Sequence, residues 1–287
     1  MKKIFIKTAT LVAAVVAAGQ LWAAGATFPL DPFPKAKLND LAALQNGAKL
    51  FINHCLNCHS ASAIRYNRLQ DLGLTEEQIK ENLLFTSDKI GDLMTIAMKP
   101  ADAKQWFGVL PPDLSLTARS RATYTTSGPD WVYTYLRTFY RDSERPTGWN
   151  NLVFENVGMP HVLWDLQGVR TLEKEQIKKS TDEKTGQEAW KKVFTNIDEY
   201  GLRTVKQEVL PAGGYYHEST QVKWNTQDAA KAKAYDNQIA DLVAYMTWMA
   251  EPYAKTRVQL GVWVLIFLFI FTIFAWGLNR AYWKDIK

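Results

Sequence analysis

The sequence predicts a mostly α-helical domain with long loops, followed by one membrane-spanning helix near the C-terminus. Apolar residues recur at helical spacing in two segments, residues 41–54 and 237–250, and this spacing favours helices that bury one face. A third segment, residues 258–278, is uncharged and apolar on every side, as a helix surrounded by lipid must be. Most of residues 64–235 is expected to form loops around the helical core.

Length and charge set broad limits on function. The 287 residues suffice for one large domain or two ordinary ones. The formal charge of +5 comes from the two ends: residues 1–24 and residues 251–287 each contribute +3, so residues 25–250 carry −1. A near-neutral domain gives no reason to expect nucleic acid as a partner. No pairing of a nucleophile with a base stands out in the sequence, so we expect no hydrolytic site.

The first 24 residues are predicted to be a secretory signal peptide. Lysines at positions 2, 3 and 7 precede a short apolar run at residues 11–18, and small residues follow at 23–26. This order is typical of a cleaved export signal. A second membrane span is the alternative, and the shortness of the apolar run argues against it. The domain formed by residues 25–257 is therefore expected to fold outside the cytoplasm.

Two helices are predicted to cross at the centre of the domain. Gly47, Phe51 and Cys55 follow one another at intervals of four, which places them on one face of the helix over residues 41–54. The absence of a side chain at Gly47 allows a second helix to approach closely. The second helix, residues 237–250, offers an apolar stripe made of Ile239, Leu242, Val243, Met246 and Met249. Crossed terminal helices of this kind resemble the class I cytochrome c fold.

The only two cysteines lie in the sequence Cys55-Leu56-Asn57-Cys58-His59. This spacing is the attachment signature of a c-type haem. Two thiols one helical turn apart can form thioethers to the two vinyl groups of one haem, and the imidazole of His59 can then bind the iron. We therefore expect one covalently attached haem c.

Two other uses of the cysteines remain open at this point. A disulfide between Cys55 and Cys58 would suit an exported thiol-exchange protein, although such motifs accompany a βαβ pattern that is missing here. A zinc site would need two further ligands, taken from the four histidines at positions 54, 59, 161 and 217.

A second iron ligand is expected opposite His59, because a haem that only carries electrons usually keeps six ligands on its iron. Met159 is the preferred candidate, since it lies in the loop sequence Gly158-Met159-Pro160, where proline excludes regular structure. His161 is the rival ligand. The methionines at positions 94, 98, 246 and 249 have helical spacing and are predicted to pack in the core.

Taken together, motifs along nearly the whole mature chain resemble the cytochrome c1 family. In order, these are the haem attachment sequence, the segment Gly108-Val109-Leu110-Pro111-Pro112-Asp113-Leu114-Ser115, the pair Arg119 and Arg121, the loop at Gly158-Met159-Pro160, and Trp248-Met249-Ala250-Glu251-Pro252 ahead of a single span. The resemblance implies a class I cytochrome c-like haem domain with long loop insertions.

The resemblance also assigns roles to individual residues. It implies that Cys55 and Cys58 hold haem c covalently and that His59 and Met159 bind the iron. Arg121, and less firmly Arg119, would bind a haem propionate, which suits the forked guanidinium group. Pro111 and Pro112 are expected to stiffen the loop along one haem edge, so Pro112 is counted among the cofactor-binding residues.

The function implied by the resemblance is electron relay. The haem would take one electron from the Rieske iron–sulfur subunit and pass it to a cytochrome c, within a ubiquinol–cytochrome c reductase complex that also contains cytochrome b. The chain would be an electron-transfer subunit without a substrate site of its own. A membrane-tethered monohaem cytochrome c that serves another oxidase or reductase is the alternative, and a non-haem thiol or disulfide module is a more distant one.

Two stretches outside these motifs also carry predictions. Residues 171–192 mix lysines with acidic residues, and we expect a solvated helix or loop there rather than a docking surface for cytochrome c. Residues 213–216, Gly-Gly-Tyr-Tyr, are predicted to form a short hairpin turn.

The helix over residues 258–278 is long enough to cross a bilayer. Basic residues flank both of its ends, so charge alone orients it weakly. The predicted export signal decides the orientation: the haem domain in the periplasm, a single pass through the inner (plasma) membrane among its lipids, and residues 279–287 in the cytoplasm.

Overall fold

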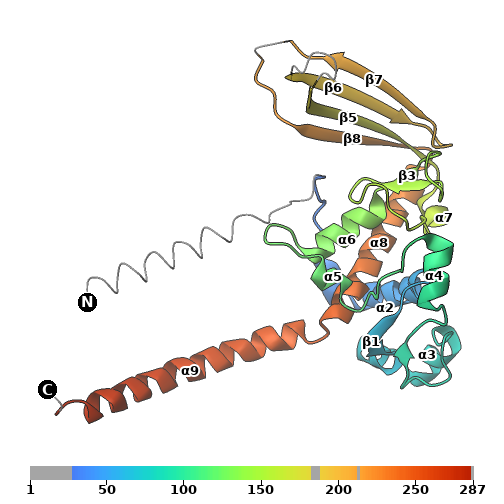
Figure 1. The fold of residues 1–287 in the computed structure, drawn as a ribbon. Coiled ribbons are helices and arrows are strands. Elements are labelled where there is room, and N and C mark those ends of the chain that lie inside the picture. Colours follow the sequence, from blue (N-terminus) through green and yellow to red (C-terminus); the bar gives the residue numbers. More distant parts are fainter. Residues whose placement is uncertain (1–27, 182–187, 212–213, 286–287) are drawn as a thin grey trace.

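The computed structural model of the protein describes residues 28–181, 188–211 and 214–285. The predicted signal peptide, residues 1–24, lies outside the described residues. Figure 1 shows three parts in the described chain: a helical body, a four-stranded sheet that extends from it, and a long C-terminal helix.

Two crossed helices form the centre of the body, as the sequence predicts. Helix α2 spans Leu41–Leu50 and continues into a π-helical turn, η2, at Phe51–Cys55. Helix α8 spans Ala229–Ala250 and starts well before the predicted residue 237. The helices approach so closely at Gly47 that a Cβ atom there would lie 2.0 Å from the carbonyl oxygen of Asp241. Only glycine fits this crossing.

Helix α6, Gly128–Arg137, packs against α8 as the third main helix of the body. It begins at a capped N-terminus, where the side chain of Ser127 accepts a hydrogen bond from the amide of Asp130. One continuous apolar core joins the three helices to the segments around them, with Phe51, Leu56 and Tyr245 fully buried in it.

Short elements surround these helices, and most of them lie within residues 64–235, which the sequence predicts as loops. They are η1 (Lys35–Asn39), β1 (Ala61–Arg65), η3 (Tyr66–Leu72), α3 (Glu76–Asn82), β2 (Leu93–Met94), α4 (Pro100–Phe107), α5 (Thr117–Ser120), β3 (Phe139–Arg141), β4 (Trp149–Asn151) and α7 (Trp164–Gln167). Strand β1 pairs with β2, and β3 pairs with β4, both antiparallel.

The four-stranded antiparallel sheet is the main departure from the predicted fold. Its strands are β5 (Arg170–Thr181), β6 (Glu188–Ile197), β7 (Arg203–Val209) and β8 (Ser219–Thr226), in the spatial order β7-β6-β5-β8. The prediction of a solvated helix or loop over residues 171–192 is wrong.

The alternating charges of this region form ion pairs between neighbouring strands of the sheet. Lysines and glutamates on neighbouring strands face each other: the Lys192 ammonium lies 2.7 Å from the Glu175 carboxylate, and the Lys223 ammonium 3.5 Å from the Glu173 carboxylate. Cross-strand pairs of opposite charge stabilise a sheet. The opposite face carries the few apolar anchors, of which Leu172, Val193 and Ile197 are buried.

The predicted hairpin turn at residues 213–216 is also wrong. Strands β7 and β8, which flank it, lie at opposite edges of the sheet, so their connection crosses the end of the sheet and does not reverse between neighbours. Residue 213 itself lies outside the described residues.

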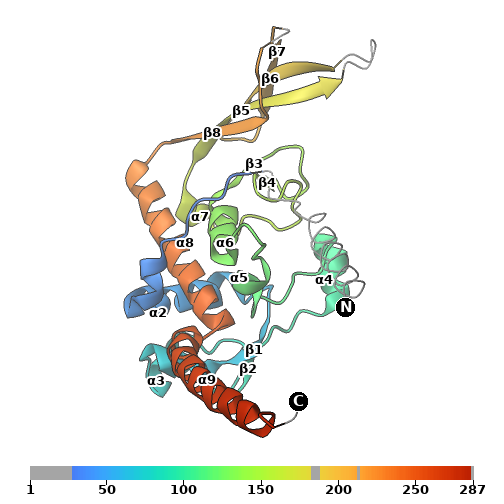
Figure 2. The same ribbon diagram turned by 90° about the vertical axis from the view of Figure 1, so that its left-hand side faces the viewer.

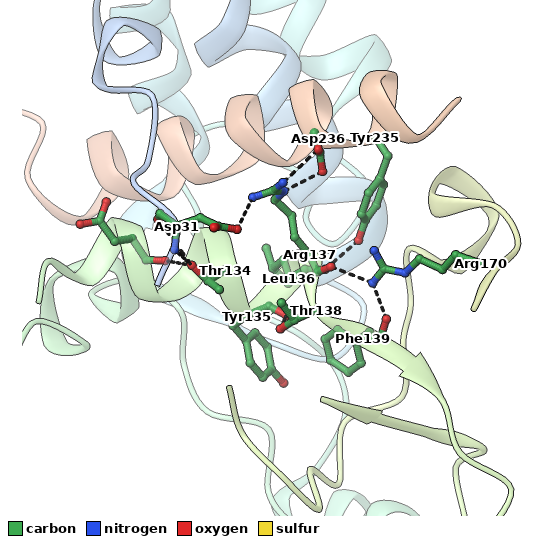
Figure 3. A network of polar contacts seen from close by, with 11 residues as sticks. Asp31, Thr134, Tyr135, Leu136, Arg137, Thr138, Phe139, Arg170, Tyr235 and Asp236 are labelled. Carbon is green, nitrogen blue, oxygen red and sulfur yellow. Dashed lines mark hydrogen bonds and ion pairs between the residues drawn. The ribbon is translucent and has the colours of Figure 1, made fainter. Parts of the chain in front are cut away.

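A buried arginine joins the base of the sheet to the body. The Nη2 atom of Arg170 donates to the carbonyl oxygen of Arg137 at 2.7 Å and also to that of Phe139, while the guanidinium plane lies 3.7 Å from the centre of the Trp224 ring. Figure 3 shows Arg170 reaching the end of α6 from the start of β5. Burial lowers the pKa of Arg170 to about 10, which leaves it charged at neutral pH.

A second arginine in the same network ties α6 to α8 and to the N-terminal segment (Figure 3). Arg137 donates to both carboxylate oxygens of Asp236, at 2.6 and 3.0 Å, and to Asp31 at 2.7 Å. Bidentate pairing of this kind fixes both distance and angle between the two helices.

Helix α9, Ala254–Tyr282, contains the predicted membrane-spanning segment. Its 29 residues rise about 43 Å, more than the ~30 Å thickness of a hydrocarbon core. Its most apolar window has a mean hydropathy of 2.5 and no residue buried inside the protein. The helix is therefore long and apolar enough to cross a membrane, and it projects from the body without packing on it (Figure 1).

Candidate haem-binding site

The two cysteines lie where the central helix ends. Cys55 closes the π-helical turn η2 and is buried, and Cys58 follows on the next turn and is half-buried. The amide of His59 donates to the carbonyl oxygen of Cys55 at 2.9 Å, which keeps the motif in a compact turn. Both thiols are free rather than joined in a disulfide. Burial and the neighbouring Cys58 raise the pKa of the Cys55 thiol to about 12.

A hydrogen bond sets the orientation of the His59 ring. Its Nδ1 atom lies 2.7 Å from the carbonyl oxygen of Pro112. A carbonyl oxygen only accepts, so Nδ1 carries the proton and Nε2 keeps its lone pair in the neutral ring. Burial lowers the pKa of His59, although the Pro112 carbonyl and Asp113 oppose that shift. A neutral ring with a free Nε2 is the form that binds a metal ion.

The Pro112 carbonyl is itself held in place by Asp113. The Asp113 carboxylate accepts hydrogen bonds from the amide and hydroxyl of Ser62, at 2.8 and 2.7 Å, and from the amide of Ser115 at 2.8 Å. The amide of Leu114 donates to the Ser60 carbonyl at 2.9 Å. The carbonyl group of Pro112 therefore orients His59, a role that the sequence did not predict for this residue.

Met159 lies in a loop beside an aromatic stack on α6. The Tyr135 hydroxyl donates to the Met159 sulfur at 3.4 Å. The Tyr135 ring stacks on that of Trp131, with centroids 5.0 Å apart and planes at 12°. The Arg121 guanidinium lies 4.3 Å from the centre of the Trp131 ring. Burial raises the pKa of Tyr135, so its hydroxyl stays protonated and remains a donor.

One loop connects the surroundings of Met159 with those of His59. A Cβ atom at Gly158 would lie 3.2 Å from the Val109 side chain, and Val109 is three residues from Pro112, whose carbonyl binds His59. Three residues span at most about 11 Å between Cα atoms. The two residues predicted to bind iron are thus brought to one region of the body.

The other histidines and methionines have different surroundings. His161 is buried between Phe139, which stacks on it at 4.8 Å, and Trp149, at 4.9 Å. Burial and the Arg170 charge lower its pKa to about 3. Met94, Met246 and Met249 are buried in the core, and Met98 is half-buried. His54 is half-buried and His217 is exposed.

The two predicted propionate ligands differ in their surroundings. Arg121 lies against Trp131, which stacks on Tyr135, the residue whose hydroxyl contacts Met159. Arg119 is exposed, and its guanidinium lies 4.0 Å from the carboxylate of Glu251, which also pairs with Arg257 at 2.5 Å. Arg119 therefore faces the start of α9 rather than the aromatic stack.

The donor set fits a covalently bound haem. Two free thiols stand one turn apart, an imidazole offers Nε2, a thioether lies within reach of the same region, and Arg121 supplies a positive charge. By contrast, no group of three or more His, Cys, Asp or Glu side chains is arranged to hold a metal ion within the described parts of the chain. The zinc interpretation thus lacks its ligands there.

Sequence reasoning missed Tyr135, whose hydroxyl contacts Met159, and the contact of His59 with the carbonyl group of Pro112. Trp131 and Tyr135 are four apart and therefore share a face of α6, but nothing in the sequence connects that face with residues 156–160. The hydrogen bond from His59 to Pro112 joins positions 53 apart in the chain. Only the folded structure brings these groups together.

Several known proteins are similar to this chain over most of its length. The family model described as "Cytochrome C1 family" matches residues 35–185 and 219–286. A cytochrome c1 from Allochromatium vinosum is 41% identical over 87% of this chain and 86% of its own length, and one from Rhodospirillum rubrum is 28% identical over 86% and 83%. A Nitrosomonas europaea protein named ammonia monooxygenase gamma subunit is 39% identical over 98% of this chain and 97% of its own length.

Proposed function

The chain belongs to the cytochrome c1 family, and on this premise we propose that it relays single electrons from a Rieske iron–sulfur subunit to a cytochrome c. It would do so as the haem subunit of a ubiquinol–cytochrome c reductase complex. The observation that carries the proposal is the free Nε2 of His59, oriented by the Pro112 carbonyl beside two free thiols. The family implies haem c as the cofactor, and this donor set suits it.

Each site residue has a physical role in this proposal. Cys55 and Cys58 would hold haem c through two thioethers, and His59 and Met159 would bind its iron. Such a haem supplies one-electron redox chemistry. The protein's contribution is to keep both ligands in place and to exclude other reactions. Arg121 would neutralise a propionate, whereas the position of Arg119 supports a role next to the anchor helix.

We place the haem domain in the periplasm and α9 in the inner membrane. Cytochrome c1 proteins are membrane-anchored, and α9 has the length and hydropathy that an anchor needs. In the proposed topology the predicted signal peptide exports the domain, and the C-terminus stays in the cytoplasm. Cytochrome b and the Rieske subunit would lie beside α9 in the same membrane.

Purification of the intact chain in a mild detergent tests the proposal. We expect a c-type band in the pyridine haemochrome spectrum, a polypeptide mass increased by one haem, and co-purification of cytochrome b and a Rieske protein with quinol–cytochrome c reductase activity. A polypeptide without haem would refute the electron-carrier role. A haem-loaded chain that carries neither partner would refute only the assignment to this complex.

A second candidate function follows from the relative named ammonia monooxygenase gamma subunit. Its identity extends over nearly the full length of both chains, so a membrane-tethered cytochrome that serves a different oxidoreductase is a specific alternative. The same purification separates the two functions. Co-purification of monooxygenase subunits, in place of cytochrome b and the Rieske protein, would favour the alternative.

A further inference from the structure

The free end of the four-stranded sheet points to the same side of the molecule as the anchor helix. This distal end consists of the tips of β5 and β6, the end of β7 and the start of β8, because the strands alternate in direction. In Figure 1 the distal end of the sheet and the C-terminal end of α9 both point to the left, the sheet above the helical body and α9 below it. In Figure 2 the sheet and α9 lie at opposite ends of the body.

Aromatic and apolar side chains gather at the distal end. Trp190 on β6 lies 6.1 Å from Tyr216, which precedes β8, and the Leu210 amide donates to the Trp190 carbonyl at 2.9 Å. Beside this pair, Tyr215 is fully exposed (105%) and Val209 is 63% exposed. Tryptophan and tyrosine are enriched at membrane–water interfaces, because each combines an apolar ring with a polar tip.

The distal end also carries a pair of lysines in an unfavourable arrangement. Lys178 on β5 lies directly opposite Lys191 on β6. Like charges at facing positions destabilise a sheet. An anionic surface would offset this repulsion, and phospholipid headgroups present such a surface to basic residues near a membrane. Glu188 at the same end pairs with Lys179, so Lys178 and Lys191 are the facing pair whose repulsion an anionic surface would relieve.

Strands β6 and β7 lie in a segment added between the two parts of the chain that match the family model. The matched residues, 35–185 and 219–286, leave out residues 186–218, which contain β6, β7 and the connection to β8. Trp190, Lys191, Val209 and the two tyrosines all belong to this added segment. The aromatic residues of the distal end therefore lie outside the part of the chain that matches the family model.

We propose that the distal end of the sheet rests on the headgroup layer of the membrane that α9 spans. Tyr215, Trp190 and Tyr216 would lie at the boundary between headgroups and acyl chains, with Lys178 and Lys191 on the phosphates. Because the sheet and α9 lie at opposite ends of the body, the haem domain then has two separate supports. Contact at the distal end of the sheet and anchoring by α9 would together fix the tilt of the haem domain over the bilayer.

Photocrosslinking of the full-length, haem-loaded chain tests this contact directly. Tyr215 is replaced by p-benzoylphenylalanine, and the protein is reconstituted into vesicles of equal parts phosphatidylcholine and phosphatidylglycerol and irradiated. We expect an adduct of one phospholipid mass. Tyr200 is the matched control, since it is 74% exposed at the opposite end of the same sheet, between β6 and β7, and it should give no lipid adduct.

A positive control keeps every outcome informative. The same replacement at Phe269, which is 68% exposed on α9, must give a lipid adduct because this residue lies within the span. If Phe269 crosslinks to lipid and Tyr215 does not, the proposal is overturned. A Tyr215 adduct with a second copy of the chain or with another protein overturns it equally, and so does a lipid adduct of equal yield at Tyr200.

The lysine pair has its own test in the same system. The double substitution Lys178→Gln and Lys191→Gln should lower the Tyr215–lipid adduct severalfold in vesicles that contain phosphatidylglycerol, and leave it unchanged in pure phosphatidylcholine. Lys223→Gln, an exposed lysine nearer the base of β8, is the control and should have no effect. Equal losses for both variants would overturn the role of the pair.

Discussion

Each of the two residues proposed to bind iron is held by an oxygen atom from another part of the chain. The Pro112 carbonyl accepts from Nδ1 of His59, and the Tyr135 hydroxyl donates to the sulfur of Met159. The first contact increases the electron density that the imidazole offers to a metal ion, and the second decreases the density on sulfur. These hydrogen-bond partners therefore orient the two ligands and tune how strongly each would bind a metal ion.

Replacement of the proposed sixth ligand should open the iron without releasing the haem. In Met159→Leu the sulfur ligand of the iron is removed, while the proposed covalent links from Cys55 and Cys58 to the haem are left in place. We expect the c-type spectrum to remain, the reduction potential to fall and carbon monoxide to bind the reduced protein. Redox titration and difference spectra with carbon monoxide measure both effects.

Met94→Leu is the matched control for this substitution. Met94 also has a tyrosine neighbour, since the Tyr245 hydroxyl lies 3.7 Å from its sulfur, but it is fully buried in the core. A Met-to-Leu exchange in a core costs less than about 1.5 kcal/mol of stability, so Met94→Leu should fold normally. Its reduction potential should match that of the unchanged protein, because Met94 is not the proposed iron ligand. A carbon monoxide complex in Met94→Leu but not in Met159→Leu would transfer the ligand role.

Removal of the hydroxyl that contacts Met159 should shift the potential by a small amount. In Tyr135→Phe the ring still stacks on Trp131, but the sulfur no longer receives a hydrogen bond. A more electron-rich sulfur stabilises ferric iron, so the potential should fall by up to about 40 mV, which corresponds to ~1 kcal/mol for one electron. Tyr245→Phe, next to Met94, should leave the potential unchanged. A rise in Tyr135→Phe would contradict this account.

At the scale of elements, sequence spacing is enough to predict the central helices. Gly47, Phe51 and Cys55 recur every four residues, and the apolar stripe of residues 237–250 is equally regular, so their crossing is foreseeable. The sheet is not foreseeable in the same way. Its strands pair lysine with glutamate on one face, and alternation of charges along a chain also fits a solvated helix. Only pairing between strands distant in sequence distinguishes the two.

The helix crossing gives a prediction for stability. In Gly47→Ala the new methyl group would lie 2.0 Å from the Asp241 carbonyl oxygen and 2.7 Å from the Tyr245 Cβ. Both neighbours are anchored in α8, so the helices must move apart. We expect a loss of more than about 3 kcal/mol in the free energy of unfolding, measured by denaturant titration.

Gly91→Ala serves as the control for Gly47→Ala. A methyl group at Gly91 meets no atom within 4 Å, so the free energy of unfolding should change by less than about 1 kcal/mol. Similar losses in the two variants would show that the crossing is not the cause.

For the whole molecule, the sequence predicts which parts exist better than how they are arranged. The haem signature and the membrane span are each a single short stretch of the chain, so short-range sequence patterns suffice to find them. The joining of the sheet to the body depends on Arg170, which reaches carbonyl groups more than 30 residues away. Contacts of that kind leave no periodic trace in the sequence.

The independence of the anchor gives the last prediction. Helix α9 has no buried residue. Among the described residues, two polar contacts tie its start to the body: the ion pair between Arg257 and Glu251, and the hydrogen bond that Arg68 donates to the Tyr253 hydroxyl. A chain ended after Arg257 keeps both. We expect it to be exported, to carry haem with an unchanged spectrum and potential, and to appear in the soluble periplasmic fraction.

A truncated chain that unfolds or loses its haem would show that the body needs the helix. A truncated chain that still binds the membrane firmly would reveal a second membrane-binding site strong enough to hold the domain alone. Cell fractionation with haem staining, compared with the full-length chain, distinguishes these outcomes.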